Sequence, residues 1–127
     1  MLAMSLADFC HKELKEWRSA MELFMQELQG YNQRLNDVAG KNNKDVVLKQ
    51  VEHFQNQFIV QKDNIQTMLH EIKIQEQNIA EDVRRDKILD ETDIIGNQSF
   101  LREKVHTTEK IFVALKHDFY SFLARSL

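Results

Sequence analysis

The stretch ADFCHKELKEWRSAMELFMQELQGYNQRLNDV, residues 7–38, decides the fold. Its apolar side chains recur at alternating spacings of three and four residues, the heptad pattern of a helix that packs along another helix. They are Ala7, Cys10, Leu14, Trp17, Met21, Phe24, Leu28, Tyr31, Leu35 and Val38. Ser5 can cap this helix and Gly40 favours its end, so the pattern predicts a helix over residues 5–39.

A second heptad seam follows with the same alternation of spacings. It consists of Val47, Val51, Phe54, Phe58, Gln61, Ile65, Met68, Ile72, Gln75 and Ile79, and it is flanked by the apolar residues Ile59, Leu69, Ile74 and Val83. The flanking residues widen the apolar stripe, which favours a helix that contacts two neighbours. With Asn42 or Asn43 as its cap, this segment predicts a helix over about residues 44–88.

A third seam leads to the C-terminal end of the sequence. It consists of Leu101, Val105, Thr108, Phe112, Leu115, Phe119 and Phe122. Gly96 and Asn97 favour a break before it, so the pattern predicts a helix over residues 97–126.

Three such helices joined by short connections predict an all-α fold, an elongated antiparallel three-helix bundle with coiled-coil-like heptad packing. The chain has 127 residues, 3 glycines and no proline, which argues against a turn-rich β fold and for a single domain over residues 1–127. Antiparallel packing should bring Tyr31 close to Phe54, Phe58, Phe112 and Phe119, so one end of the bundle is expected to be aromatic.

Charge is distributed unevenly between the last two helices. Residues 43–96 carry 7 basic and 11 acidic side chains, a net −4, whereas residues 97–127 carry 5 and 3, a net +2. This asymmetry predicts that the second and third helices attract each other. Exposed pairs contribute only about 0.2 to 1 kcal/mol each, so we expect charge to select neighbours and apolar burial to supply the stability.

Polar residues interrupt the seams at Gln61, Gln75 and Thr108. A buried amide at a seam position can fix the register of a helical bundle if its hydrogen bonds are satisfied. In the alternative arrangement the helix rotates locally and these side chains face solvent. The sequence leaves both readings open.

The fragment Glu103-Lys104-Val105-His106 carries the most metal-like spacing in the chain. Di-iron bundles use Glu-x-x-His on two helices together with two further glutamates, and this chain offers one copy only. We therefore expect no metal site and no cofactor. A ferritin-like or hemerythrin-like bundle that holds a metal or small ligand is the alternative function, and Glu103 and His106 are its best candidates.

No residue pattern indicates catalysis, and we expect no catalytic residue. Cys10 next to His11 is the closest approach to a nucleophile with a base, but a seam cysteine behaves as a small apolar side chain. The glycines stand apart, so no phosphate-binding loop is formed. We expect Glu13→Gln, a change outside the seams, to be nearly silent.

Composition also limits the partners. The formal net charge of −3 gives no general attraction to nucleic acid, and no run approaches the roughly 18 apolar residues that a membrane span needs. Cys10 is the single cysteine, so no internal disulfide framework is possible, which fits a cytoplasmic protein.

The leading hypothesis is a non-enzymatic protein that acts through protein–protein interaction, as an adaptor, an assembly chaperone or a structural subunit. We expect a homodimer or a helical protein partner. The predicted interaction surface consists of surplus apolar residues near the two ends of the chain, Leu2, Leu6, Phe9, Tyr120, Leu123 and Leu127.

Overall fold

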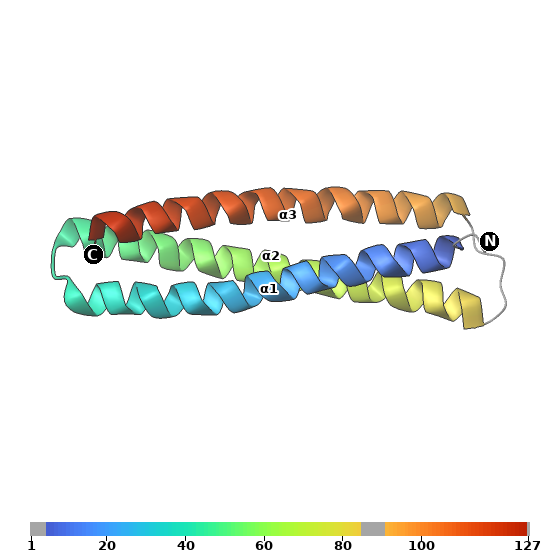
Figure 1. The fold of residues 1–127 in the computed structure, drawn as a ribbon, viewed down its shortest axis with the longest axis horizontal. Coiled ribbons are helices and arrows are strands. Elements are labelled where there is room, and N and C mark those ends of the chain that lie inside the picture. Colours follow the sequence, from blue (N-terminus) through green and yellow to red (C-terminus); the bar gives the residue numbers. More distant parts are fainter. Residues whose placement is uncertain (1–4, 85–90, 127) are drawn as a thin grey trace.

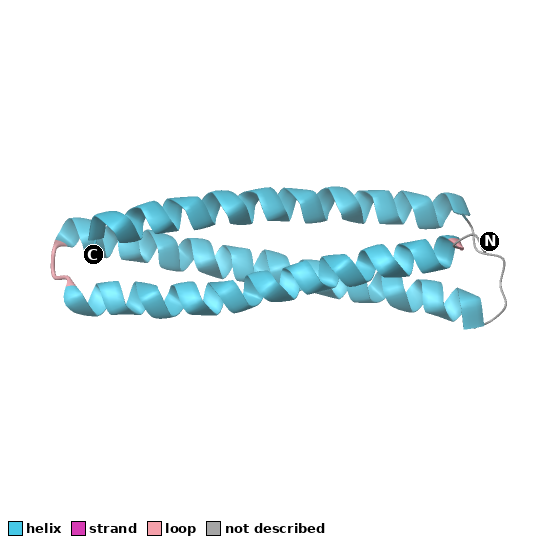
Figure 2. Ribbon diagram, viewed as in Figure 1, coloured by secondary structure: helices cyan, strands magenta, loops and turns pink. Residues whose placement is uncertain are grey.

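The computed structural model describes residues 5–84 and 91–126 and folds as an elongated bundle of three long helices (Figure 1). α1 spans Leu6–Lys41, α2 spans Asp45–Arg84 and α3 spans Glu91–Ser126. α1 and α3 run in the same direction and α2 runs against both (Figure 1). The described residues contain no strand (Figure 2). The predicted all-α three-helix bundle is therefore confirmed.

Local hydrogen bonds set the ends of α1. The Ser5 hydroxyl accepts a hydrogen bond from the Asp8 backbone N–H at 3.1 Å, which confirms Ser5 as the N-cap. At the other end the helix continues through Gly40 to Lys41, two residues beyond the predicted end. It stops there because Asn42 adopts an extended backbone and its side-chain amide donates to the Val38 carbonyl at 2.9 Å.

The start of α2 differs slightly from the prediction. The Leu48 N–H donates to the Lys44 carbonyl at 3.0 Å, so the cap position falls on Lys44 rather than on Asn42 or Asn43. The other end of α2 is described as far as Arg84, and the predicted end at residue 88 lies outside the described residues.

The predicted seams of α1 and α2 form the core. Within residues 10–38 every seam side chain of α1 is buried except Phe24, which is half-buried, and within residues 51–79 every seam side chain of α2 is buried. Of the residues that flank the α2 seam, Leu69 packs against the core, while Ile59, Ile74 and Val83 remain exposed. α2 contacts both other helices as predicted, and α1 and α3 also contact each other.

α3 begins six residues before the predicted start at 97, at Glu91, and passes through Gly96 without a break. The reason is that the heptad alternation continues backwards to Gln98 and Ile94, which are both buried. A glycine inside a helix costs about 1 kcal/mol relative to alanine, whereas burying one large apolar side chain contributes about 1.5 to 3 kcal/mol. Burial of Ile94 therefore outweighs the helix-breaking tendency of Gly96.

One half of the bundle is filled with aromatic rings, as the sequence predicted. The Tyr31 ring lies 6.0 Å from the Phe58 ring and 5.2 Å from the Phe119 ring, measured between centroids. Phe54 and Phe122 lie 5.1 Å apart by the same measure. Such pairs add about 0.5 to 1.5 kcal/mol each beyond their burial, so this half is the firmer part of the core.

Ion pairs connect all three helices. Arg18 of α1 pairs with Glu76 of α2 at 2.6 Å, and Lys104 of α3 pairs with Glu71 of α2 at 3.2 Å. Basic residues of α3 also pair with α1, because Arg102 binds Glu13 at 2.7 Å. The predicted attraction between α2 and α3 is thus only part of the charge pattern.

No helix within the described residues is both long enough and apolar enough to cross a membrane.

We expect Gly96→Ala to stabilise the protein. Gly96 is an exposed residue inside α3, and a Cβ atom added there would meet no other atom within 4 Å. Alanine should therefore raise the free energy of unfolding by about 0.5 to 1 kcal/mol. Thermal unfolding followed by circular dichroism checks this, with Gly40→Ala in the last turn of α1 as a control of smaller expected effect. A lower melting temperature for Gly96→Ala would show that α3 does not pass through this position.

Candidate functional site

The described residues of the predicted interaction surface lie at the two opposite ends of the rod (Figure 1). α1 begins at the end of the rod opposite to the end of α3, so Leu6 and Phe9 lie far from Tyr120 and Leu123 (Figure 1). Leu6 is half-buried against the core and Phe9 is exposed. The two remaining members, Leu2 and Leu127, lie outside the described residues.

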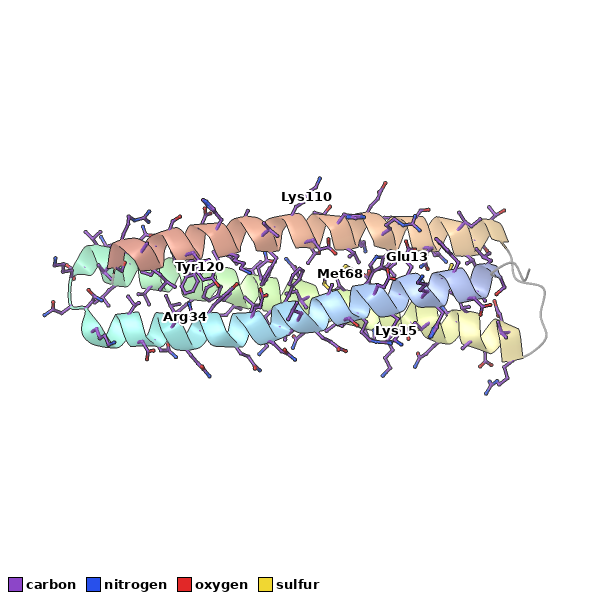
Figure 3. The ribbon with its side chains drawn as sticks, in the orientation of Figure 1. Glu13, Lys15, Arg34, Met68, Lys110 and Tyr120 are labelled. Carbon is purple, nitrogen blue, oxygen red and sulfur yellow. The ribbon has the colours of Figure 1, made fainter. Side chains whose placement is uncertain are left out.

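At the aromatic end, the expected exposure of Leu123 is wrong. Leu123 is only 6% exposed, because the seam of α3 widens in its last turns and the bundle covers this side chain itself. Tyr120 keeps 41% of its surface, with its ring 5.7 Å from the Tyr31 ring between α3 and α1 (Figure 3). At this end the predicted interaction surface therefore keeps Tyr120 and loses Leu123.

The metal-like fragment does not gather a ligand set. Glu103 and His106 are both exposed on α3. His70, the histidine that the sequence offers on the neighbouring helix, is also exposed. Across residues 5–84 and 91–126, no three His, Cys, Asp or Glu side chains lie close enough together to hold a metal ion.

Cys10 is buried in the core, while the adjacent His11 is exposed. Burial raises the pKa of the Cys10 thiol, and the neighbouring Glu13 carboxylate raises it further. A thiol reacts as the thiolate, so both effects make this cysteine a poor nucleophile.

The most connected polar cluster lies around Gln98 of α3, a residue that the sequence analysis missed. The Gln75 amide donates to the Gln98 side-chain oxygen at 3.2 Å, and the Gln98 amide donates to the Cys10 carbonyl at 3.3 Å and to Glu13 Oε1 at 3.0 Å. Arg102 then binds both Glu13 oxygens, through Nε at 2.8 Å and an Nη at 2.7 Å. We call Glu13, Gln75, Gln98 and Arg102 the polar layer.

The structure shows whether the polar seam residues are buried or face solvent. Gln75 is buried and its amide is hydrogen-bonded to Gln98 of α3, so it can fix the register of α2 against α3. Gln61 is buried too, but its side-chain oxygen has no hydrogen-bond partner among the described residues. The half-buried Thr108 donates to the Lys104 carbonyl of its own helix at 3.0 Å and does not bridge helices.

Electrostatics in the polar layer favour a charged Glu13. Partial burial raises the pKa of this carboxyl, but hydrogen bonds from Arg102 and Gln98 outweigh burial, and the net pKa lies below its ordinary value. The position of Glu13 between α1 and α3 is visible in Figure 3. It explains why the expectation of a silent Glu13→Gln change does not fit the structure.

A groove of about 420 Å³ opens between α2 and α3. Phe100 and Ile111 of α3 line it and are 61% and 45% exposed, and Met68 forms part of its floor. Lys104 also lines it, and its Nζ lies 3.2 Å from Glu71 and 4.5 Å from the centroid of the Phe100 ring. Apolar side chains left open in this way are typical of a binding surface rather than of a catalytic centre.

Ion pairs cross the other helix–helix interfaces. The cavity between α1 and α2, about 620 Å³, is lined largely by charged side chains that include Arg18, Lys73 and Glu76. Between α1 and α3 the Arg102–Glu13 and Lys116–Glu27 pairs span the two helices. The α2–α3 groove is our candidate for binding another protein, because the large apolar side chains of Phe100 and Ile111 line it and remain exposed.

Comparison of the chain with protein-family models, with curated proteins and with solved structures gives no match.

We expect Glu13→Gln to destabilise the protein. The neutral amide loses the charge-assisted bonds to Arg102, at a cost of about 1 to 2 kcal/mol in unfolding free energy near pH 7. Because folding lowers the pKa of Glu13, its stabilisation is complete above the ordinary value of 4.5 and is lost as the pH falls through the lower folded value.

Chemical denaturation of both proteins at several pH values measures this effect. The difference in unfolding free energy should stay constant near neutral pH and shrink at acidic pH. Glu16→Gln, an exposed position on the same helix, serves as the matched control and should show no such trend. A pH-independent difference would contradict the assigned role of Glu13.

We also expect no stoichiometric metal in the purified protein, because Glu103 and His106 lack further ligands within the described residues. Elemental analysis after purification checks this. Bound iron, zinc or manganese that disappears in His106→Ala would instead favour the ferritin-like or hemerythrin-like alternative.

Proposed function

We propose that this protein is a non-enzymatic interaction module that binds a protein partner along its α2–α3 groove, as an adaptor, an assembly chaperone or a structural subunit. One observation carries the proposal, the exposure of Phe100 and Ile111 beside a groove that runs between two helices. Grooves of this kind bind amphipathic helices through apolar side chains that repeat along the helix axis.

The spacing of the apolar residues supports this proposal. On α2, Val60 and Ile74 are 51% and 42% exposed and lie seven residues to either side of Thr67, which lines the groove. Residues seven apart share one face of a helix that packs in a coiled-coil manner. Apolar side chains therefore extend the groove in both directions along α2.

Energetics also favour a bound partner. Fully burying one large apolar side chain contributes about 1.5 to 3 kcal/mol, and the exposed fractions of Val60, Ile74, Phe100 and Ile111 leave roughly half of that for binding. Four such contributions amount to about 3 to 6 kcal/mol, and the apolar side chains of the partner add to them against the entropic cost of binding. The surface charges near the groove are mixed in sign, which suits a protein rather than a nucleic acid.

The buried Cys10, with its raised pKa, supports the non-enzymatic part of the proposal. The same single, buried cysteine supports a cytoplasmic location as part of the proposal, because a reducing compartment leaves such a thiol free. A second copy of the chain and a helical protein are the two partners we consider.

Site-specific photo-crosslinking in the native host tests the proposed function. A photoreactive residue in place of Thr107, in the groove, should give a covalent adduct with a protein. The matched control carries the same residue in place of Ser19, an exposed position on α1. Equal labelling from both positions, or none from Thr107, would contradict binding at the groove.

A further inference from the structure

We propose that the partner in the α2–α3 groove is a second copy of this chain, docked antiparallel about a two-fold axis that passes beside Thr67 and Thr107. This inference rests on the proposed function and adds the identity and orientation of the partner. The inference depends on the sizes and charges of the side chains that lie at equal distances before and after these two threonines.

The two threonines mark the same level of the bundle. The Lys104–Glu71 pair fixes how far α2 and α3 have advanced past each other. Thr67 lies four residues before Glu71, and Thr107 lies three residues after Lys104. Because the helices are antiparallel, these steps lead to nearly the same height, and both threonines line the groove.

Apolar side chains flank this centre on both helices. Seven residues on either side of Thr107 lie Phe100 and Ala114, both exposed. In a copy turned by the two-fold axis, the large Phe100 ring meets the small Ala114 of the second copy. On α2 the same rotation brings Ile74 opposite Val60 of the second copy. Large and small side chains thus alternate across the interface, as close packing requires.

Charges repeat about the same centre. Glu103, which lines the groove, lies four residues before Thr107, and Lys110 lies three residues after it; both are exposed. Lys110 points away from its own bundle in Figure 3. An antiparallel second copy places Glu103 of one chain opposite Lys110 of the other, twice per dimer.

α2 carries the same pattern at the same offsets. Asp63 lies four residues before Thr67 and His70 lies three residues after it, and both are exposed. The rotation that pairs Glu103 with Lys110 therefore also brings the Asp63 carboxylate opposite the His70 imidazole, a hydrogen-bond donor in either tautomer. The face is self-complementary on both of its helices.

A second copy could also lie parallel to the first, with the axis along the rod. In that arrangement Phe100 would face the large Ile74, while Val60 would face the small Ala114. One part of the interface would then be crowded and another loosely filled. The charges would pair about equally well there, because Glu103 would face His70 and Lys110 would face Asp63. Side-chain packing therefore favours the antiparallel copy.

A charge-swap experiment on the full chain tests this inference. Analytical ultracentrifugation of the wild type should show a concentration-dependent dimer. Glu103→Lys and Lys110→Glu should each weaken dimerisation by about tenfold, because each places like charges opposite one another at two points. The double variant carrying both changes should restore it. Glu16→Lys on α1 is the control for charge alone, and circular dichroism verifies that every variant is folded.

A monomeric wild type at high micromolar concentration would overturn the second copy as partner. The proposed function would still stand in that case if Thr107 crosslinks to a different protein. A dimer that both single changes leave intact would show that copies meet at another surface. A double variant that stays weak would overturn the antiparallel orientation.

Disulfide trapping tests the orientation separately. Thr107→Cys lies next to the proposed axis, so it should form a disulfide with its own counterpart under mild oxidation. In the parallel arrangement Thr107 would instead face Thr67 of the second copy. The wild type, whose Cys10 is 1% exposed, and Ser19→Cys are the controls and should remain uncrosslinked. Equal trapping by Ser19→Cys and Thr107→Cys would contradict the proposed axis.

Discussion

Arg102 of α3 holds the Glu13 carboxylate of α1 in a bidentate pair, and two heptads further along Lys116 approaches Glu27 at 3.6 Å. Both pairs join residues that are 89 positions apart in the chain, so the parallel helices α1 and α3 advance in step. An exposed pair contributes only about 0.2 to 1 kcal/mol, and we expect the partly buried Glu13–Arg102 pair to contribute about 1 to 2 kcal/mol. The role of these pairs is to select one alignment, while burial of the apolar seams supplies the stability.

This alignment determines which surface remains available. The charged side chains of α1 are engaged with α3 through Glu13 and Glu27, and with α2 through Arg18. Between α2 and α3 the residues of the Lys104–Glu71 pair line the groove, and Phe100 beside them remains exposed. On the α2–α3 face Phe100 and Ile111 thus remain uncovered by the bundle's own helices, and we propose that this face binds a second copy.

The sequence was sufficient for the three seams, because heptad periodicity follows directly from the geometry of packed helices. It was insufficient where a local signal and a tertiary contact disagree. Gly96 suggested a break, but burial of Ile94 and the bonds of Gln98 continue the helix past it. Leu123 was expected on the surface, because heptad spacing does not show where a seam widens.

The candidate site was harder to predict than the fold. Phe100 lies outside the seams, and only the spatial neighbourhood of α2 and α3 shows that it lines a groove with residues such as Thr67. The part that the sequence could have revealed is the repeat of charges about Thr67 and Thr107. The sequence could not reveal that these two threonines lie at nearly the same height along the bundle, because that height depends on how α2 and α3 are aligned with each other.

The distance between spin labels at Asn36 of α1 and Ala124 of α3 tests the central claim, that these helices are parallel and in step, most directly. Both positions are exposed at the aromatic end. Dilution of the labelled chain with unlabelled chain removes the distances between labels on different copies. The structure predicts a single short distance of about 20 Å, two neighbouring helices plus the labels. A distance of about 50 Å, the length of one helix, would contradict the alignment and with it the assignment of the free face.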